Sequence, residues 1–240
     1  EIVELRCLRV DARRRNADRH LELDDATLCF FVARRAAAAR DLDTVDDMLE
    51  RCLRHAPHHV AGLATLANHY KAARRFGDAD HAFRRLVQAN PVRSNSLQNY
   101  ALFLETCRRD HDTAELLYAR ALKLDPNNLL ALTNFAVFLK NVRHDYDYAE
   151  ALYQRAIRLN PYHASTIGNY ALFLHQVRHN YTKADQLYRL VLRLTDNRDK
   201  FWMARYSRFL ATLQKADLLD DLLQRRLPPL DLHGGGAEQQ

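Results

Sequence analysis

The sequence is poor in the residues that form loops and break helices. Its 240 residues include only 6 glycines and 6 prolines, with 1 tryptophan and 2 methionines. Disordered and low-complexity chains are usually rich in glycine and proline, so this composition argues against both classes. The hydrophobic fraction of 48% is large enough to form a substantial core.

Long apolar runs are also missing. No stretch approaches the roughly 20 apolar residues that a transmembrane helix needs. Residues 1–15 contain neither the apolar segment nor the small-residue cleavage site of a signal peptide. We therefore expect no membrane span and no signal peptide, and we expect the chain to be an excerpt of a longer protein.

Cysteine is scarce and scattered. Cys7, Cys29, Cys52 and Cys107 form no C-x-x-C pair, a spacing that suits reduced thiols. This pattern predicts an intracellular, cytoplasmic protein.

The motifs of common enzyme classes are absent as well. There is no Gly-rich phosphate loop, no G-x-S-x-G and no H-E-x-x-H. The nearest approaches to a metal site are His175 with His179, and the cluster of His55, His58 and His59. Neither group has a cysteine or a carboxylate at ligand spacing. We predict a chain that is not an enzyme, with no catalytic residue, no metal and no cofactor.

What the sequence does contain is one motif in three copies. Segments beginning at Gln98, Thr133 and Gly168 read QNYALFLETCRR, TNFAVFLKNVRH and GNYALFLHQVRH, 35 residues apart. Two earlier units end at Pro57 and Pro91, 34 residues apart. A fixed period of this length is the signature of a stacked-repeat solenoid. We place the extra residue of the later units in the turn between their two helices.

Within each unit the apolar residues follow helical spacing. In the fourth unit Leu132, Phe135, Ala136 and Leu139 form the stripe of an amphipathic first helix. This predicts an all-α array over 26–227 that follows an N-terminal connector, 1–25, and precedes a flexible tail, 228–240. The array divides into units 26–59, 60–93, 94–128, 129–163 and 164–198 and a divergent capping helix pair, 199–227.

The second helices carry a possible start signal. Asp112 with Glu115, and Asp147 with Glu150, have the three-residue spacing of a capping box. We therefore predict Asp112 and Asp147 as N-caps.

The pattern resembles the tetratricopeptide repeat (TPR) family. A Leu, a small Ala and a later aromatic or Leu mark the first helix, and Ala114, Tyr118 and Ala121 show the Ala-aromatic-Ala pattern of the second. A proline closes each of the first four units. The resemblance implies a right-handed superhelix of five helix-turn-helix repeats, whose first helices line a concave groove that holds peptides.

Residues opposite the core stripe of the first helices are the candidate groove residues, and asparagine recurs among them. A carboxamide both donates and accepts hydrogen bonds, so a column of asparagines can bind a peptide backbone of any sequence. Such a column resembles the asparagine ladders of TPR grooves. The alternative is that each asparagine bonds a neighbouring repeat or faces water. The candidates are Asn99, Asn134, Asn169, Asn68, Asn95, Leu102, Leu130, Val137, Asn141, Leu172 and Gln176.

These residues predict a non-catalytic scaffold or adaptor that binds an unidentified peptide or partner subunit, within a larger complex or alone. A carboxylate clamp for chaperone C-termini fits less well, because Ala64 and Leu130 stand where lysine or arginine would be needed. Phe30 and Phe31 at one end and Trp202 at the other are candidates for contact with the rest of a longer protein. For Trp202 we favour burial.

Nucleic acid is the less favoured partner. The net charge of +6 comes mostly from arginine, which can bind phosphate. Acidic residues recur at the same period and offset the basic ones, so charge alone favours a solvated outer face. The basic columns are Arg108, Arg143 and Arg178; Arg120 and Arg155; and Lys123, Arg158 and Arg193.

Overall fold

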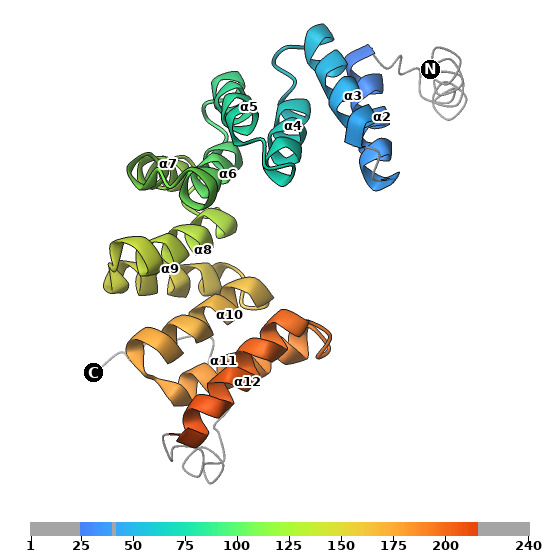
Figure 1. Cartoon of the computed structure of the whole chain (residues 1–240). Helices are drawn as coiled ribbons and strands as arrows, with labels where there is room; N and C mark the ends of the chain where they lie inside the picture. Colours follow the sequence, from blue (N-terminus) through green and yellow to red (C-terminus); the bar gives the residue numbers. More distant parts are fainter. Residues whose placement is uncertain (1–24, 40–41, 216–240) are drawn as a thin grey trace. The chain divides into compact units, whose positions relative to one another are not determined.

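The computed structural model describes residues 25–39 and 42–215, and within these ranges the chain is helical with no strand (Figure 1). The all-α prediction is confirmed. The predicted N-terminal connector, the second helix of the capping pair and the tail lie outside the described residues, apart from Asp25, where the first described helix begins. The number of repeats and their boundaries stay predictions.

The chain forms two compact units, residues 1–96 and 97–240. In the first unit, α2 packs on α3, α4 packs on α5, and α3 also contacts α4. The helices are α2 (Asp25–Ala39), α3 (Leu42–His55), α4 (Val60–Ala72) and α5 (Phe76–Ala89).

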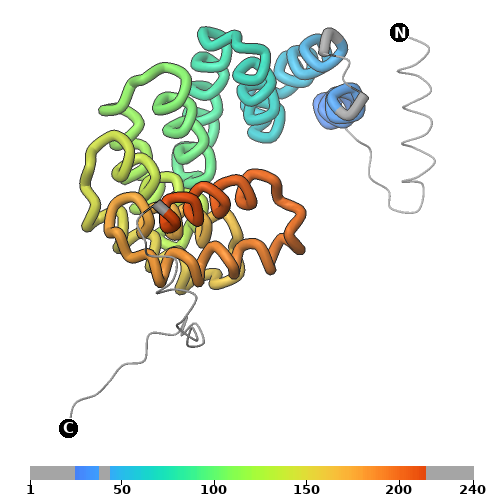
Figure 2. The backbone as a smooth tube through the Cα atoms, turned by 60° about the horizontal axis from the view of Figure 1, so that its bottom comes forward, coloured from blue at the N-terminus to red at the C-terminus, as the bar shows by residue number. Residues whose placement is uncertain are grey.

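The second unit contains the three repeats of period 35, in which each first helix ends in a π-helical turn, η. From α7 to α12, each helix packs against the helices next to it along the chain, and η1 packs on α7 (Figure 2). The first helices are α6 (Ser94–Phe103) with η1 (Leu104–Arg108), α8 (Leu129–Phe138) with η2 (Leu139–Arg143), and α10 (Ala164–Phe173) with η3 (Leu174–Arg178). The start of α6, up to Ser96, belongs to the first unit. The second helices are α7 (His111–Leu124), α9 (Tyr146–Leu159) and α11 (Tyr181–Leu194), and α12 (Lys200–Lys215) follows them.

The extra residue of the later repeats lies in the π-helical turn, not in the connecting turn where we expected it. In the shorter repeat, the Arg75 amide donates to the Tyr70 carbonyl, five residues back. In the longer ones, the Asp110 amide donates to the carbonyl of Leu104, six residues back. A residue with positive φ then ends each first helix, such as Arg109 at φ 60°. The helix absorbs the insertion by widening its last turn, so the connection to the second helix does not become longer.

The predicted N-caps are wrong by two residues. Asp110 and Asp145, rather than Asp112 and Asp147, accept the first amide hydrogen bonds of α7 and α9. The positive-φ residue before each cap reverses the chain sharply, so the second helix starts at once. Asp112 and Asp147 therefore lie in the first helical turn with their carboxylates available to other partners.

The start of α12 is seated on a glycine of the preceding repeat. Trp202 is only 5% exposed, in agreement with the burial that we favoured for this residue. A Cβ atom built on Gly168 would lie 2.4 Å from the Trp202 ring, closer than any real contact. Gly168 therefore provides the space that the indole fills. At the other end Phe31 stays 48% exposed, while Phe30 packs against the buried cluster of Ala26, Cys29 and Cys52.

We predict that Gly168→Ala destabilises the chain. Overpacking costs about 1–3 kcal/mol, which exceeds the gain of roughly 1 kcal/mol from replacing a helical glycine. Gly77→Ala is the matched control, because nothing lies within 4 Å of a Cβ at that position of α5. Urea denaturation should show a lower midpoint for Gly168→Ala and an equal or higher one for Gly77→Ala. Equal midpoints for the two variants would contradict the packing role.

Candidate peptide-binding surface

The candidate residues lie on the side of the first helices that faces away from their core. In α8, Leu132, Phe135 and Ala136 are buried, whereas Asn134 is half-buried and Leu130 is 48% exposed. Helical periodicity separates the two sets, because residues three and four apart share a face. We call the outward set of the second unit the first-helix surface. Its members are Asn99, Leu102, Leu130, Asn134, Val137, Asn141, Asn169, Leu172 and Gln176, all half-buried or exposed.

Two candidates belong to the first unit instead. Asn68 is exposed, and its Nδ2 donates to the Ala64 carbonyl of its own helix at 2.9 Å. Asn95 is also exposed. The first-helix surface of the second unit therefore does not include them.

The three recurring asparagines occupy equivalent places on consecutive first helices. Asn99, Asn134 and Asn169 are each half-buried. None of the three carboxamides forms a hydrogen bond with another side chain or backbone group in residues 25–39 and 42–215. The alternative in which they tie one repeat to the next is therefore not seen among these residues. Their donors and acceptors are available to a ligand or to water.

Charged and polar residues lie beside this column, in the π-helical turns. Glu105, Lys140 and His175 hold the same repeat position but have different partners. Glu105 accepts a hydrogen bond from the Tyr118 hydroxyl at 2.8 Å, and burial nevertheless raises the pKa of the Glu105 carboxyl. Lys140 Nζ donates to Gln176 Oε1 of the next repeat at 2.7 Å. This repeat position thus carries an acid in one repeat, a lysine in the next and a histidine in the third.

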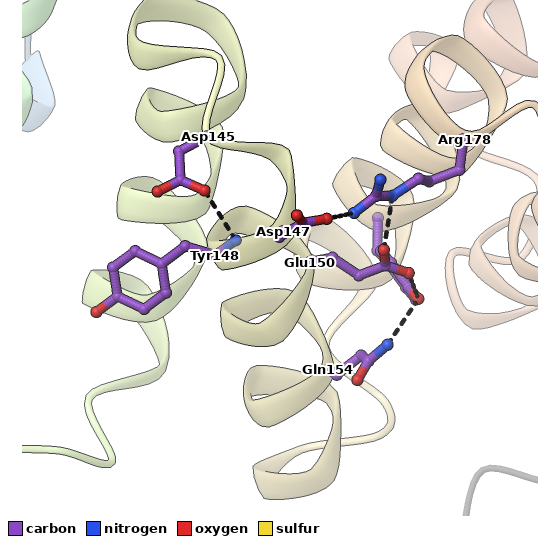
Figure 3. Close-up of polar contacts among 7 residues, drawn as sticks. Asp145, Asp147, Tyr148, Glu150, Gln154 and Arg178 are labelled. Carbon is purple, nitrogen blue, oxygen red and sulfur yellow. Dashed lines mark hydrogen bonds and ion pairs between the residues drawn. The ribbon is translucent and has the colours of Figure 1, made fainter.

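Arginines of the basic columns turn out to link neighbouring repeats. Arg178 forms a fork in which Nη2 pairs with Asp147, and Nε pairs with Glu150 at 2.7 Å (Figure 3). Glu150 also accepts a hydrogen bond from the Tyr170 hydroxyl at 3.0 Å. These contacts connect α9 with the following first helix and its π-helical turn. The pKa of Arg178 is raised, chiefly by its hydrogen bonds to the two carboxylates.

Arg143 repeats the arrangement one unit earlier, with Asp112 and Glu115 as partners. An arginine that is already shared between two carboxylates is a poor phosphate ligand. The phosphate-tracking column that we considered is therefore not supported at Arg143 and Arg178. The sequence had shown the acidic residues at the same period, but only the fold shows that they face the arginines.

Other kinds of site are sparse. In the first unit, a pocket of about 370 Å³ lies between α3, α4 and α5, with Glu50, Tyr70 and Arg85 among its lining residues. Within the described residues, no group of three or more His, Cys, Asp or Glu side chains could hold a metal ion. No helix there is both long and apolar enough to cross a membrane.

Comparison with known proteins shows a likeness of structure only. The sequence matches no model of a known protein family, and no curated protein is similar to it. Among solved structures, the type IV pilus biogenesis factor PilW superposes with a TM-score of 0.68 at 16% identity, over 88% of this chain and 97% of PilW. PilF of Pseudomonas aeruginosa gives a TM-score of 0.66 at 18% identity, over 82% of this chain and 88% of PilF.

A third structure, YrrB, is described as a TPR protein with an unusual peptide-binding site. It superposes with a TM-score of 0.54 at 16% identity, over 83% of this chain and 97% of YrrB. The fold is that of tetratricopeptide repeats. The resemblance drawn from the sequence is confirmed at this level, and at such low identity it shows the fold alone.

We predict that Glu105→Gln changes how stability depends on pH. The folded-state pKa of Glu105 lies above its ordinary value of 4.5, so its contribution to stability is greatest at low pH. That contribution is lost as the pH rises from about 4.5 through the raised pKa, because folding then buries a charge. Glutamine stays neutral and still accepts from Tyr118, so the variant should be the more stable protein at pH 7 and lose this advantage near pH 4.

Tyr118→Phe serves as the opposite test. Removing the hydrogen bond that lowers the Glu105 pKa should make stability fall more steeply with rising pH. Thermal unfolding of the three proteins from pH 4 to pH 8 measures both effects. A stability difference between Glu105→Gln and the parent that does not change with pH would contradict this account.

Proposed function

We propose that the chain is a non-catalytic scaffold or adaptor that binds an extended peptide, or an extended segment of a partner subunit, along the first-helix surface. The observation that carries this proposal is the column of Asn99, Asn134 and Asn169. Three half-buried carboxamides, with no hydrogen-bond partner in residues 25–39 and 42–215, are repeated at one position of consecutive helices. A half-buried amide that forms no hydrogen bond in the free protein can gain one from a ligand.

The spacing suits an extended backbone. Packed helices lie roughly 8–10 Å apart, and an extended chain advances about 3.3 Å per residue. Each carboxamide would then meet the backbone about once every three peptide residues. Leu102, Val137 and Leu172 recur beside the amides and are half-buried, so they offer apolar contact to ligand side chains.

The structural neighbours support the same class of function. YrrB has the same fold and is described as having a peptide-binding site. PilW is a biogenesis factor for type IV pili. A scaffold that holds a peptide needs no catalytic group, in line with the absence of enzyme motifs from the sequence. We also propose an intracellular location, since Cys29, Cys52 and Cys107 form no disulfide with one another.

We predict that the triple variant Asn99→Ala, Asn134→Ala and Asn169→Ala loses peptide affinity without unfolding. Each lost hydrogen bond should weaken binding by roughly 1 kcal/mol. The probes are extended 12-residue peptides selected on the parent protein from a random display library, and titration gives their dissociation constants. Helical circular dichroism and thermal unfolding should stay unchanged.

The matched control replaces three residues that recur at the same period on the second helices: Lys123→Ala, Arg158→Ala and Arg193→Ala. All three side chains are exposed and lie away from the proposed surface, so this control should bind like the parent. A dissociation constant that the asparagine variant leaves unchanged would dispose of the proposal.

A further inference from the structure

The asparagine column continues into α12 as an arginine. Tyr206 and Phe209 pack on Tyr188 with ring centroids 5.8 and 5.4 Å away. In the preceding repeat, Tyr170 and Phe173 pack on Tyr153 at 5.6 and 5.7 Å. The helix α12 therefore takes the place of the next first helix, with its residues shifted by 36 instead of 35.

This correspondence assigns a place to Arg205. Asn169 comes directly before Tyr170, and Arg205 comes directly before Tyr206. Arg205 thus holds the position of the asparagines on the next first helix. It is half-buried, and its guanidinium carbon lies 5.0 Å from the centre of the Phe201 ring.

A second cation comes close to Arg205 from the other side of α10. Lys140 lies in the π-helical turn of the repeat before α10, and its ammonium reaches across to Gln176 at 2.7 Å. Arg205 lies one helical turn before Phe209, whose ring centre is 5.0 Å from that of His175, the chain neighbour of Gln176. Arg205 also lowers the pKa of Lys140, after the larger effect of burial. Lys140 in turn lowers the pKa of His175, where burial and His179 act more strongly. Positive charge therefore gathers around η3, the π-helical turn that carries His175 and Gln176.

No carboxylate in the described residues balances the two cations. Lys140 bonds a neutral amide, and Arg205 packs over an aromatic ring. Arg143 and Arg178, by contrast, each pair with two carboxylates. Bringing two half-buried cations together without an anion is unfavourable, and a bound anion would relieve the repulsion.

We propose that Lys140 and Arg205 bind the carboxylate of an aspartate or glutamate side chain within an extended peptide ligand. This inference rests on the proposed function, because the same peptide is held by the asparagine column. Lys140 and Arg205 come from the helices on either side of α10, which carries Asn169. The anion site therefore lies beside the column, where the peptide backbone continues, so we assign it to a side chain and not to a chain end.

The test uses three fluorescent probe peptides of eleven residues built from serine and leucine. The first is blocked at both ends and has a central aspartate. The second is identical with a central asparagine, and the third has the central asparagine and a free terminal carboxylate. Fluorescence anisotropy on the full chain at fixed ionic strength gives the dissociation constants. We expect the aspartate peptide to bind about tenfold more tightly than the blocked asparagine peptide.

Lys140→Met and Arg205→Met should each reduce this preference to less than about twofold, measured for each variant as the ratio of the dissociation constants of the blocked asparagine and aspartate peptides. Arg155→Met is the matched control, since Arg155 is also half-buried but lies on the second helix α9. It should keep the full preference. Loss of the preference in Arg155→Met as well would show a general charge effect and overturn the site.

The remaining outcomes separate this inference from the proposed function. Equal binding of the aspartate and blocked asparagine peptides, with both weakened by the asparagine-to-alanine variant, would overturn the anion site and leave the peptide surface in place. If the free-carboxylate peptide bound as tightly as the aspartate peptide, Lys140 and Arg205 would recognise the C-terminal carboxylate of a peptide. That result would overturn the proposal that they recognise an acidic side chain. If none of the three peptides bound, both proposals would fall.

Discussion

The second unit depends on a buried tyrosine that each repeat inserts against the next one. Tyr118, Tyr153 and Tyr188 come from successive second helices and are at most 1% exposed. Tyr118 packs on Phe135 and Phe138 of the following first helix, with ring centroids 5.5 and 5.7 Å away. A single helix pair has too little apolar surface for a core of its own. Aromatic contacts of this kind contribute about 0.5–1.5 kcal/mol beyond the burial of their area. Contacts between neighbouring repeats therefore stabilise the folded second unit.

Because the tyrosine contact sets how neighbouring repeats pack, equivalent residues of successive repeats occupy equivalent positions in the array. Arg143 and Arg178 reach back to the acidic residues of the preceding second helix because the tyrosine contact holds the two helices together. Such partly exposed ion pairs add little stability. They do neutralise these two arginines, so that the arginines are not available to bind a ligand. The same repetition aligns the asparagines and leaves Lys140 and Arg205 without an acidic partner in the part of the chain that the structure describes. The charge pattern of the surface thus follows from the packing beneath it.

Much of the fold and of the candidate surface could be predicted from the sequence. Ala101, Ala136 and Ala171 are fully buried at the predicted core positions, and the residues opposite them are accessible. Helical periodicity alone separates these two sets, so they can be predicted without knowing which helices pack on them. The caps were misplaced because two aspartates compete for the role in each repeat, Asp110 with Asp112 and Asp145 with Asp147. The positive-φ residue that selects between them leaves no composition signal.

The sequence by itself determined that the chain forms stacked helix pairs and that asparagine recurs on their outward side. Both follow from helical spacing within one unit and from the repetition of that unit every 35 residues. Only the tertiary structure decided that the extra residue widens a π-helical turn, that the arginines of the basic columns are paired, and that Arg205 continues the asparagine column. The widened turn depends on a hydrogen bond between residues six positions apart, which composition does not reveal. The arginine pairs join residues 28 and 31 positions apart, and the place of Arg205 depends on a shift to 36 residues. The packing of Tyr206 and Phe209 on Tyr188 reveals the shift to 36 residues, whereas a strict 35-residue period in the sequence does not.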